Sequence, residues 1–361
     1  MNDVWSMEPY PQRAVSGALT VYVRRSDSAI ATWLLVCCLL VAAIAVIGGV
    51  TRLTHSGLSI TEWQPVVGAL PPLDGAQWQD AFAKYQATPE YREVNHGMTL
   101  AEFKAIFWWE YFHRLLGRAI GFAVLLPLGW FALRRRIPPR IAWPLAGVFA
   151  LGLLQGALGW YMVKSGLVNE PRVSHLRLTA HLALAFVILG AMLWLALELL
   201  RGSRNVTDRR LAGLRRAGTW VCALVLLMVA SGGLVAGTRA GFAYNTFPLM
   251  NGRLVPAEVL MIEPWYRNFV DNMATVQLDH RMIAAMLAIV VPAFCWKVLK
   301  SAVRVAAKRA ALLLAGMLVA QIALGVATLL LVVPVALAAV HQAGAVLLFA
   351  AAVNVAHALR A

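Results

Sequence analysis

Eight long apolar stretches constrain this chain more than any other feature of its sequence. Each approaches or exceeds the ~20 residues that an α-helix needs to cross a bilayer. Backbone polar groups in lipid must bond within their own segment, which favours helices. We therefore predict an all-α integral membrane protein with eight transmembrane helices, at roughly 29–50, 109–133, 141–163, 177–199, 217–237, 279–299, 309–331 and 335–358. The short connection at Pro334 predicts a tight hairpin between the last two.

Composition and charge agree with a membrane protein. Of the 361 residues, 60% are hydrophobic and 14% are charged, which is unusual for a soluble domain. The formal net charge of +15 would also suit nucleic-acid binding, but the basic residues gather in alternate connections. This positive-inside pattern indicates topology, with the N- and C-termini cytoplasmic, and no nucleic-acid partner is expected. The basic groups on that side include Arg13, Arg24, Arg25, 134–136, 201–216 and several residues from Lys297 onward.

The N-terminal residues and the cysteines lack any special motif. Residues 1–28 contain acidic side chains and no apolar core, so we interpret them as a cytoplasmic tail rather than a signal peptide. The cysteines lie inside apolar stretches without a CxxC pair, which favours small core side chains over a metal site or disulfides. They are Cys37, Cys38, Cys222 and Cys295.

The chain also repeats itself after four spans. An even number of spans per unit keeps both units in the same orientation. We predict two tandem four-helix bundles, 29–200 and 217–361, joined by a basic cytoplasmic linker at 201–216. A duplicated scaffold without paired sites is the alternative. The echoes are Gly48-Gly49 with Gly232-Gly233, His113-Arg114 with His280-Arg281, 155–159 (QGALG) with 321–325 (QIALG), and His181 with His341.

The first outer connection, 51–108, is long and rich in Gly, Pro and Trp. Pieces such as Trp63-Gln64-Pro65 and Leu70-Pro71-Pro72 indicate an ordered lid with short helices rather than a flexible linker.

Four histidines occupy matching places in the outer part of the even-numbered spans: His113, His181, His280 and His341. A polar group within a membrane segment is costly unless it has a partner, although any single one could be a packing residue. Two imidazoles facing each other across a bundle suit axial ligation of haem iron, whereas zinc favours three or four convergent ligands. Pairing within halves predicts two haem pockets toward the outer face.

Charged residues beside these histidines differ between the halves. Glu110 lies one helical turn outward of His113, while Gln277 occupies the matching position before His280. This asymmetry suggests that one pocket performs chemistry, although an ion pair of Glu110 with an arginine at i+4 is an alternative. The arginines Arg114, Arg118 and Arg281 are candidates for haem propionate contacts or for snorkelling to the interface.

The remaining histidines are weaker candidates. We interpret His175 as an interfacial residue and His55 and His96 as solvated loop residues, with His357 near the C-terminus. For His55, an approach to a haem edge or propionate is the alternative.

Three motifs carry a family resemblance that covers nearly the whole chain. Residues 48–54 (GGVTRLT), 57–63 (GLSITEW) and 107–114 (FWWEYFHR), with the repeated histidines, resemble the haem A synthases, and most closely the branch of α-proteobacteria and mitochondria. The other branch has cysteine pairs in its outer loops, which this chain lacks, so thiol-based roles do not transfer.

The resemblance implies an oxidoreductase that converts the C8 methyl of haem O to a formyl group by successive hydroxylations, for cytochrome oxidase assembly. It implies haem b between His280 and His341, haem O near His113 and His181, and Glu110 as the catalytic acid. The implied location is the bacterial inner membrane, with the haem sites toward the periplasm. Haem O synthase and oxidase assembly factors are the expected partners beside membrane lipid, and a homo-oligomer is compatible with the sequence.

Two other functions fit part of the sequence. A dihaem b-type electron-transfer protein, similar to a quinol oxidoreductase, would explain the histidines but not Glu110 or the long outer segment. A transporter would suit the repeat, but the spans lack the interruptions and midplane charges expected of one.

Overall fold

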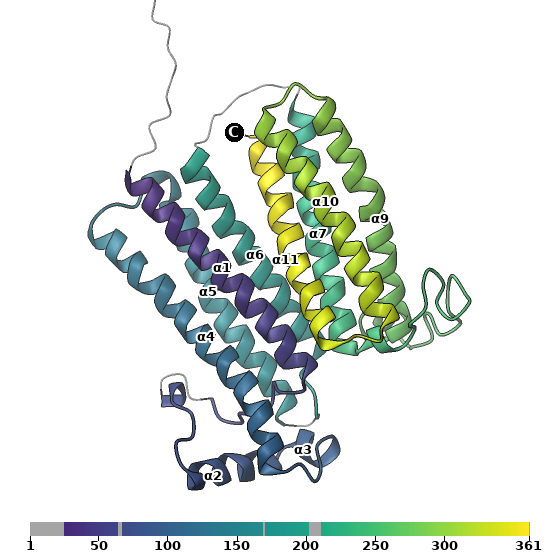
Figure 1. The fold of residues 1–361 in the computed structure, drawn as a ribbon. Helices are drawn as coiled ribbons and strands as arrows, with labels where there is room; N and C mark the ends of the chain where they lie inside the picture. Colours follow the sequence, from purple (N-terminus) through teal and green to yellow (C-terminus); the bar gives the residue numbers. More distant parts are fainter. Residues whose placement is uncertain (1–24, 64–66, 169, 202–210, 361) are drawn as a thin grey trace, which may run out of the picture.

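The structure is a computed structural model that describes residues 25–63, 67–168, 170–201 and 211–360, and these are helical or irregular apart from one isolated β-bridge. Eight helices within these ranges are long and apolar enough to cross a membrane, and they lie side by side (Figure 1). This confirms the predicted fold class. The helices are α1 (Arg25–Leu53), α4 (Leu100–Leu133), α5 (Pro139–Gly166), α6 (His175–Arg201), α7 (Ala212–Thr238), α9 (Met273–Lys300), α10 (Val305–Leu330) and α11 (Val335–Ala358).

Parts of three predicted segments lie outside the described residues. They are most of the 1–28 tail, the middle of the 201–216 linker, and Gln64-Pro65 of the outer segment.

All of the long helices except α11 begin earlier than their predicted apolar stretches. The difference is largest for α4 and α9, in which polar caps rather than hydropathy set the first turn. Predicted from 109, α4 starts at Leu100, after a capping box in which Thr99 and Glu102 bond each other's backbone N–H. For α9, the Asn272 side chain accepts from the N–H groups of the first turn. The predicted hairpin is confirmed, since α10 ends at Leu330 and α11 begins at Val335.

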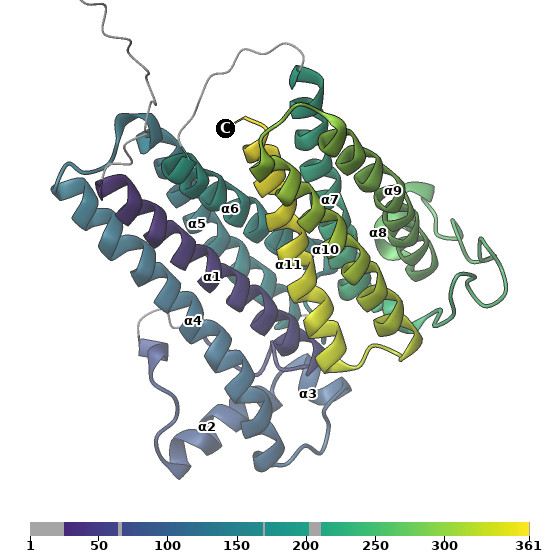
Figure 2. The ribbon, with the colours of Figure 1, turned by 45° about the horizontal axis from the view of Figure 1, so that its top comes forward.

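Contacts between the long helices fall into two matching sets. In the first half, α1 packs against α4 and α6, and α5 packs against α6; in the second, α7 packs against α9 and α11, and α10 packs against α11. Between the halves, α6 contacts α7, α1 contacts α11, and α6 meets α11, where the rings of Phe186 and Phe349 lie 5.6 Å apart. Figure 2 shows the same grouping from a second direction. This packing is compatible with the predicted tandem four-helix units.

The halves differ at one contact between helices, the seam between α4 and α5 in the first half and between α9 and α10 in the second. In the second half, α9 packs directly against α10, whereas the equivalent α4 and α5 share no extended contact along their described lengths. The first bundle is therefore less closed than the second.

The outer segment forms a small folded unit, as predicted. After a 3-10 turn at Val67–Ala69, α2 (Gly75–Gln86) and α3 (Pro89–Glu93) lie against the protruding start of α4, at the opposite end from the start of α1 and the C-terminus (Figure 1). Asp74 caps α2 and Thr88 caps α3. An aromatic core joins the unit to α4: Trp78, Phe82, Tyr85, Phe103, Phe107 and Tyr111.

A buried carboxyl lies within this unit. Glu90 of α3 is only 4% exposed, and its Oε2 accepts from the hydroxyl of Tyr85 at 3.4 Å. Burial, followed by the charge of Glu110, raises its pKa to about 7, against smaller opposing effects of Tyr85 and Arg239. The folded outer segment therefore favours the protonated form of Glu90.

We predict that the outer segment loses stability as the pH rises. Because the pKa of Glu90 rises from 4.5 to about 7 on folding, ionisation costs stability between these values, by about 3 kcal/mol in full. Amides of α2 and α3, corrected for intrinsic exchange, should exchange hydrogen more slowly at pH 5 than at pH 8. Glu90→Gln should abolish that difference, and the exposed Glu93→Gln should not. Equal protection of the wild type at both pH values would contradict this account.

Candidate functional site

Each of the four matched histidines packs against a glycine of a neighbouring helix. A Cβ atom added to that glycine would lie 2.8–3.4 Å from the imidazole Cε1 atom, so a larger residue there would displace the ring. The pairs are His113 with Gly48, His181 with Gly159, His280 with Gly232, and His341 with Gly325. The glycines that echo in the sequence are thus the surfaces on which the histidines rest.

The structure brings the histidines together in the predicted couples. His113 of α4 and His181 of α6 lie within electrostatic range of each other, as do His280 of α9 and His341 of α11. The two members of each couple come from different helices of one half.

These imidazoles fit the role of iron ligands. The Nδ1 atoms of His113, His181 and His341 are buried and make no hydrogen bond to the described residues. In these rings Nδ1 can carry the ring hydrogen and Nε2 the lone pair that would bind iron. At His181, Nε2 lies 3.4 Å from the amide nitrogen of Gln155. No cluster of three or more His, Cys, Asp or Glu that could hold a metal ion occurs in the described ranges, so zinc gains no support.

Glutamines of the repeated QxALG motif fix the helix turns that carry two of these histidines. The amide of Gln155 donates to the backbone oxygen of His181 at 3.1 Å, and that of Gln321 donates to the backbone oxygen of His341 at 2.9 Å. Each bond ties one helix of a half to the next.

His280 differs from the other three because its Nδ1 has a partner. The Ser231 oxygen lies 2.8 Å from Nδ1, while the hydroxyl donates its one hydrogen to the Met228 backbone oxygen at 2.9 Å. When the hydroxyl donates to Met228 in this way, the Ser231 oxygen is available to accept from Nδ1–H, and that arrangement leaves the lone pair of His280 on Nε2. The matching residue of the first half is Ile47, which has no hydroxyl.

Glu110 is buried and bonded on both oxygens. Oε2 accepts from the Ser59 hydroxyl and the Ile60 N–H, each at 2.8 Å, and Oε1 accepts from the Arg114 guanidinium at 2.7 and 3.0 Å. The ion pair considered as the alternative in the sequence is therefore present. Glu110 ties the chain after α1 to α4, one turn outward of His113.

The second half repeats this arrangement without the charge. Gln277 donates to the Ala240 backbone oxygen at 2.6 Å and accepts from Arg281 at 3.0 Å. Arg281 also donates to loop carbonyls of residues 244–249, as Arg114 does to those of Ile60 and Glu62. These bonds favour loop anchoring by the two arginines, and their contact with propionates stays a prediction.

The other candidates lie farther from the couples. Half-buried Arg118 is one turn inward of Arg114 on α4. His175 begins α6, where its Nε2 lies 2.9 Å from a carboxylate oxygen of Asp271. All four cysteines are free, and three are buried, in agreement with a packing role. At the opposite end of the bundle, buried His357 lies 3.3 Å from Glu198.

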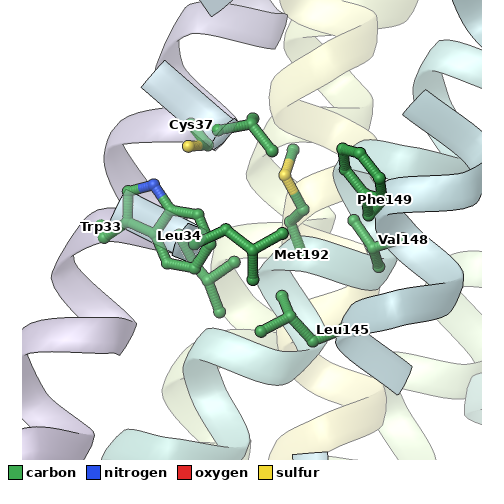
Figure 3. Close-up of a pocket in the computed structure, with 9 residues that line it drawn as sticks. Trp33, Leu34, Cys37, Leu145, Val148, Phe149 and Met192 are labelled. Atoms are coloured by element: carbon green, nitrogen blue, oxygen red, sulfur yellow. The ribbon is translucent and has the colours of Figure 1, made fainter. Parts of the chain in front are cut away.

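An apolar crevice occurs elsewhere in the first half. It lies between α1, α4, α5 and α6, and its lining includes no histidine or carboxylate (Figure 3). Its lining includes Trp33, Leu34, Cys37, Leu145, Val148, Phe149 and Met192. It is therefore separate from the histidine couples.

Sequence reasoning missed two features near the site. Ser231 directly precedes the Gly232-Gly233 echo, and comparing it with Ile47 would have revealed the asymmetry. The burial of Glu90 carries no signal in the sequence, because Thr88-Pro89-Glu90 is an ordinary helix start.

Comparisons with known proteins agree with these observations. Residues 31–353 match a family described as cytochrome oxidase assembly protein. A heme A synthase of Nitrosospira multiformis is 58% identical over 92% of this chain and 93% of its own. Heme A synthases of Nitrosomonas eutropha and Paramagnetospirillum magneticum are 50% and 48% identical, over 96% and 88% of this chain and 98% and 90% of their own. With paired histidines at the positions described above, the chain belongs to the haem A synthase family.

Proposed function

We propose that the protein oxidises the C8 methyl of haem O to a formyl group, through an alcohol and a gem-diol that loses water. The observation that carries this proposal is the presence of two histidine couples at equivalent places, in a chain whose relatives are haem A synthases. One couple serves a resident haem and the other the substrate. The same family supports the inner membrane as location, with the charge pattern favouring cytoplasmic termini.

The second half is the better site for a resident haem b. Ser231 holds His280 in the tautomer with a lone pair on Nε2, which is the form that binds iron. His341 completes the couple, supported through Gln321. A bound haem b would supply one-electron redox chemistry. These residues orient it and fix the ring tautomer.

The first half is the better site for a substrate, which must enter and leave. In the first half, α4 and α5 do not pack closely together. Several positions of these helices are glycines, whereas the corresponding positions of the second half hold larger residues. Exposed Gly152 corresponds to buried Leu318, and exposed Gly156 corresponds to half-buried Ile322. On α4, Gly121, beside which an added Cβ would meet nothing within 4 Å, corresponds to Ala288 of α9. The first bundle therefore has a less filled seam beside its histidines.

Glu110 brings a negative charge to that half only. Its four hydrogen bonds hold the carboxylate one turn outward of His113, where it would stabilise positive charge developing on the methyl carbon. The same bonds place Ser59 and Ile60 over the outer end of α4 and help to exclude water.

The haem content of histidine variants tests the function. Purified wild type should contain haem B together with haem O or haem A. His280→Ala should lose haem B, and His113→Ala should keep haem B but lose haem O and haem A, as measured by pigment extraction and chromatography. Wild type that carries haem B alone, at both couples, would instead identify an electron-transfer protein.

Substitution of Glu110 tests its role in the reaction. Glu110→Gln should fold and keep haem B, because the amide oxygen can still accept from Arg114, as that of Gln277 accepts from Arg281 in the second half. Formation of haem A should fall at least 100-fold, which is the usual effect of removing an electrostatic contribution of this kind. Activity close to the wild-type value would remove Glu110 from the mechanism.

Filling the seam tests which half admits substrate. The double variant Gly152→Leu/Gly156→Ile introduces bulk like that of Leu318 and Ile322 in α10. It should reduce bound haem O and haem A formation at least tenfold while haem B is unchanged. Gly147→Leu, also at an exposed glycine of α5, is the matched control and should behave as wild type. Loss of haem B with retention of haem O would reverse the assignment of the halves.

A further inference from the structure

Three arginines and a histidine meet at the junction of the two halves, at the outer ends of their helices. Arg52 lies in the last turn of α1, His55 follows α1, Arg172 lies between α5 and α6, and Arg239 caps α7. The Arg239 Nη2 atom donates to His55 Nδ1 at 2.9 Å. Arg52 and Arg172 each lie within electrostatic range of both His55 and Arg239.

This junction follows from the repeat. In the register that matches Gly48 with Gly232, His55 corresponds to Arg239, and both have a positive φ, 53° and 61°. Corresponding residues that contact each other must lie where the two halves meet. The cluster therefore belongs equally to the two units.

Positive charge is concentrated at this junction. None of the salt bridges between described residues joins Arg52, Arg172 or Arg239 to a carboxylate. The nearest acidic influence on Arg239 is Glu90, whose own pKa of about 7 favours the neutral form below that pH. Arg52 and Arg239 are half-buried, whereas Arg172 and His55 are exposed. Solvent therefore screens part of the repulsion between these like charges, and a bound anion would relieve the rest.

The titration of the groups outside the membrane spans agrees with this picture. Burial, followed by the charges of Arg239, Arg52 and Arg172, lowers the pKa of His55. Burial and Arg172 lower the pKa of Arg239, which Glu90 opposes. Because a guanidinium only donates, neutral His55 accepts on Nδ1 and keeps an Nε2–H donor.

The cluster lies directly outward of the histidine couples. Arg52 follows Gly48, the residue against which His113 packs, by four positions, which is one turn or ~6 Å along α1. Arg239 follows Gly232, which contacts His280, by seven positions, which is two turns or ~10 Å. Arg52 therefore lies on the face of α1 that His113 contacts, and Arg239 lies just beyond the end of α7; both are displaced toward the outer surface.

We propose that Arg52, Arg172, Arg239 and His55 form an oxyanion site that binds the carboxylates of the haem held by the adjacent histidines. This inference rests on the proposed function for the identity of the anion. Arg114 and Arg281 are less suited to the role because loop carbonyls and the side chains at 110 and 277 occupy most of their donors, although the buried Nε of Arg281 has no partner among the described residues. The phosphate of an anionic lipid has the same chemistry and is the other source to be distinguished.

Release of haem tests the site without measuring activity. Full-length protein, purified with its haem, is mixed with excess apomyoglobin, and haem transfer is followed by absorbance. Arg52→Gln and Arg239→Gln should each release haem about tenfold faster, as expected for loss of one charge-assisted bond. Exposed Arg253→Gln, on the outer loop of the second half, should match the wild type. Arg52→Lys and Arg239→Lys retain the charge and should be affected less than the glutamine variants.

Two further arms identify the anion. Haem dimethyl ester has no free carboxylates for the site to bind. Wild type and variants reconstituted with it should therefore release it at the same rate. Retention of phosphatidylglycerol, measured by native mass spectrometry, should be equal in all of them if haem is the ligand. If the variants lose phosphatidylglycerol but release haem at the wild-type rate, the oxyanion site binds lipid headgroups instead. The lipid measurement needs no bound haem, so it does not depend on the proposed function.

Two results would overturn the proposal. In the first, both glutamine variants release haem at the same rate as the wild type and retain the same amount of phosphatidylglycerol. In the second, the variants release haem and its dimethyl ester faster than the wild type by the same factor, which would indicate a general loss of packing.

Discussion

A buried imidazole needs a partner, and the architecture of this protein follows from satisfying four of them at one level of a membrane bundle. Each histidine is brought close to a neighbouring helix by a glycine, and three of the four rings keep a bare nitrogen. Glutamines of the QxALG motif then lock the histidine-bearing turns of α6 and α11. The site is thus built from helix-to-helix contacts rather than from loops.

Duplication supplied the framework, and a few substitutions made the halves different. Ser231 against Ile47 orients one ring, Glu110 against Gln277 adds one charge, and Gly152 against Leu318 changes how one seam is filled. None of these changes disturbs the shared packing of α1 with α4 and α6, or of α7 with α9 and α11. A common scaffold can therefore support the two different roles that we propose for its halves.

Much of this could be predicted from the sequence because membrane helices and repeats leave direct signals in it. Apolar length defined the eight spans, and the echoes matched His113 with His280 and His181 with His341. The couples within each half followed from that match. Helix starts were less accurate, since the capping box at Thr99 extends α4 beyond its apolar part. The loop bonds of Arg114 and Arg281, and the meeting of His55 with Arg239, depend on contacts between distant segments that no local pattern encodes.

The contact between His55 and Arg239 has a consequence for how the two halves can diverge. Most positions of a duplicated chain exist twice, so one copy can change while the other keeps the original property. Where matched positions touch, a substitution in either copy alters the surroundings of the other at once. Residues 55 and 239 are thus expected to vary together among related proteins, unlike pairs such as 152 and 318, which are free to specialise separately.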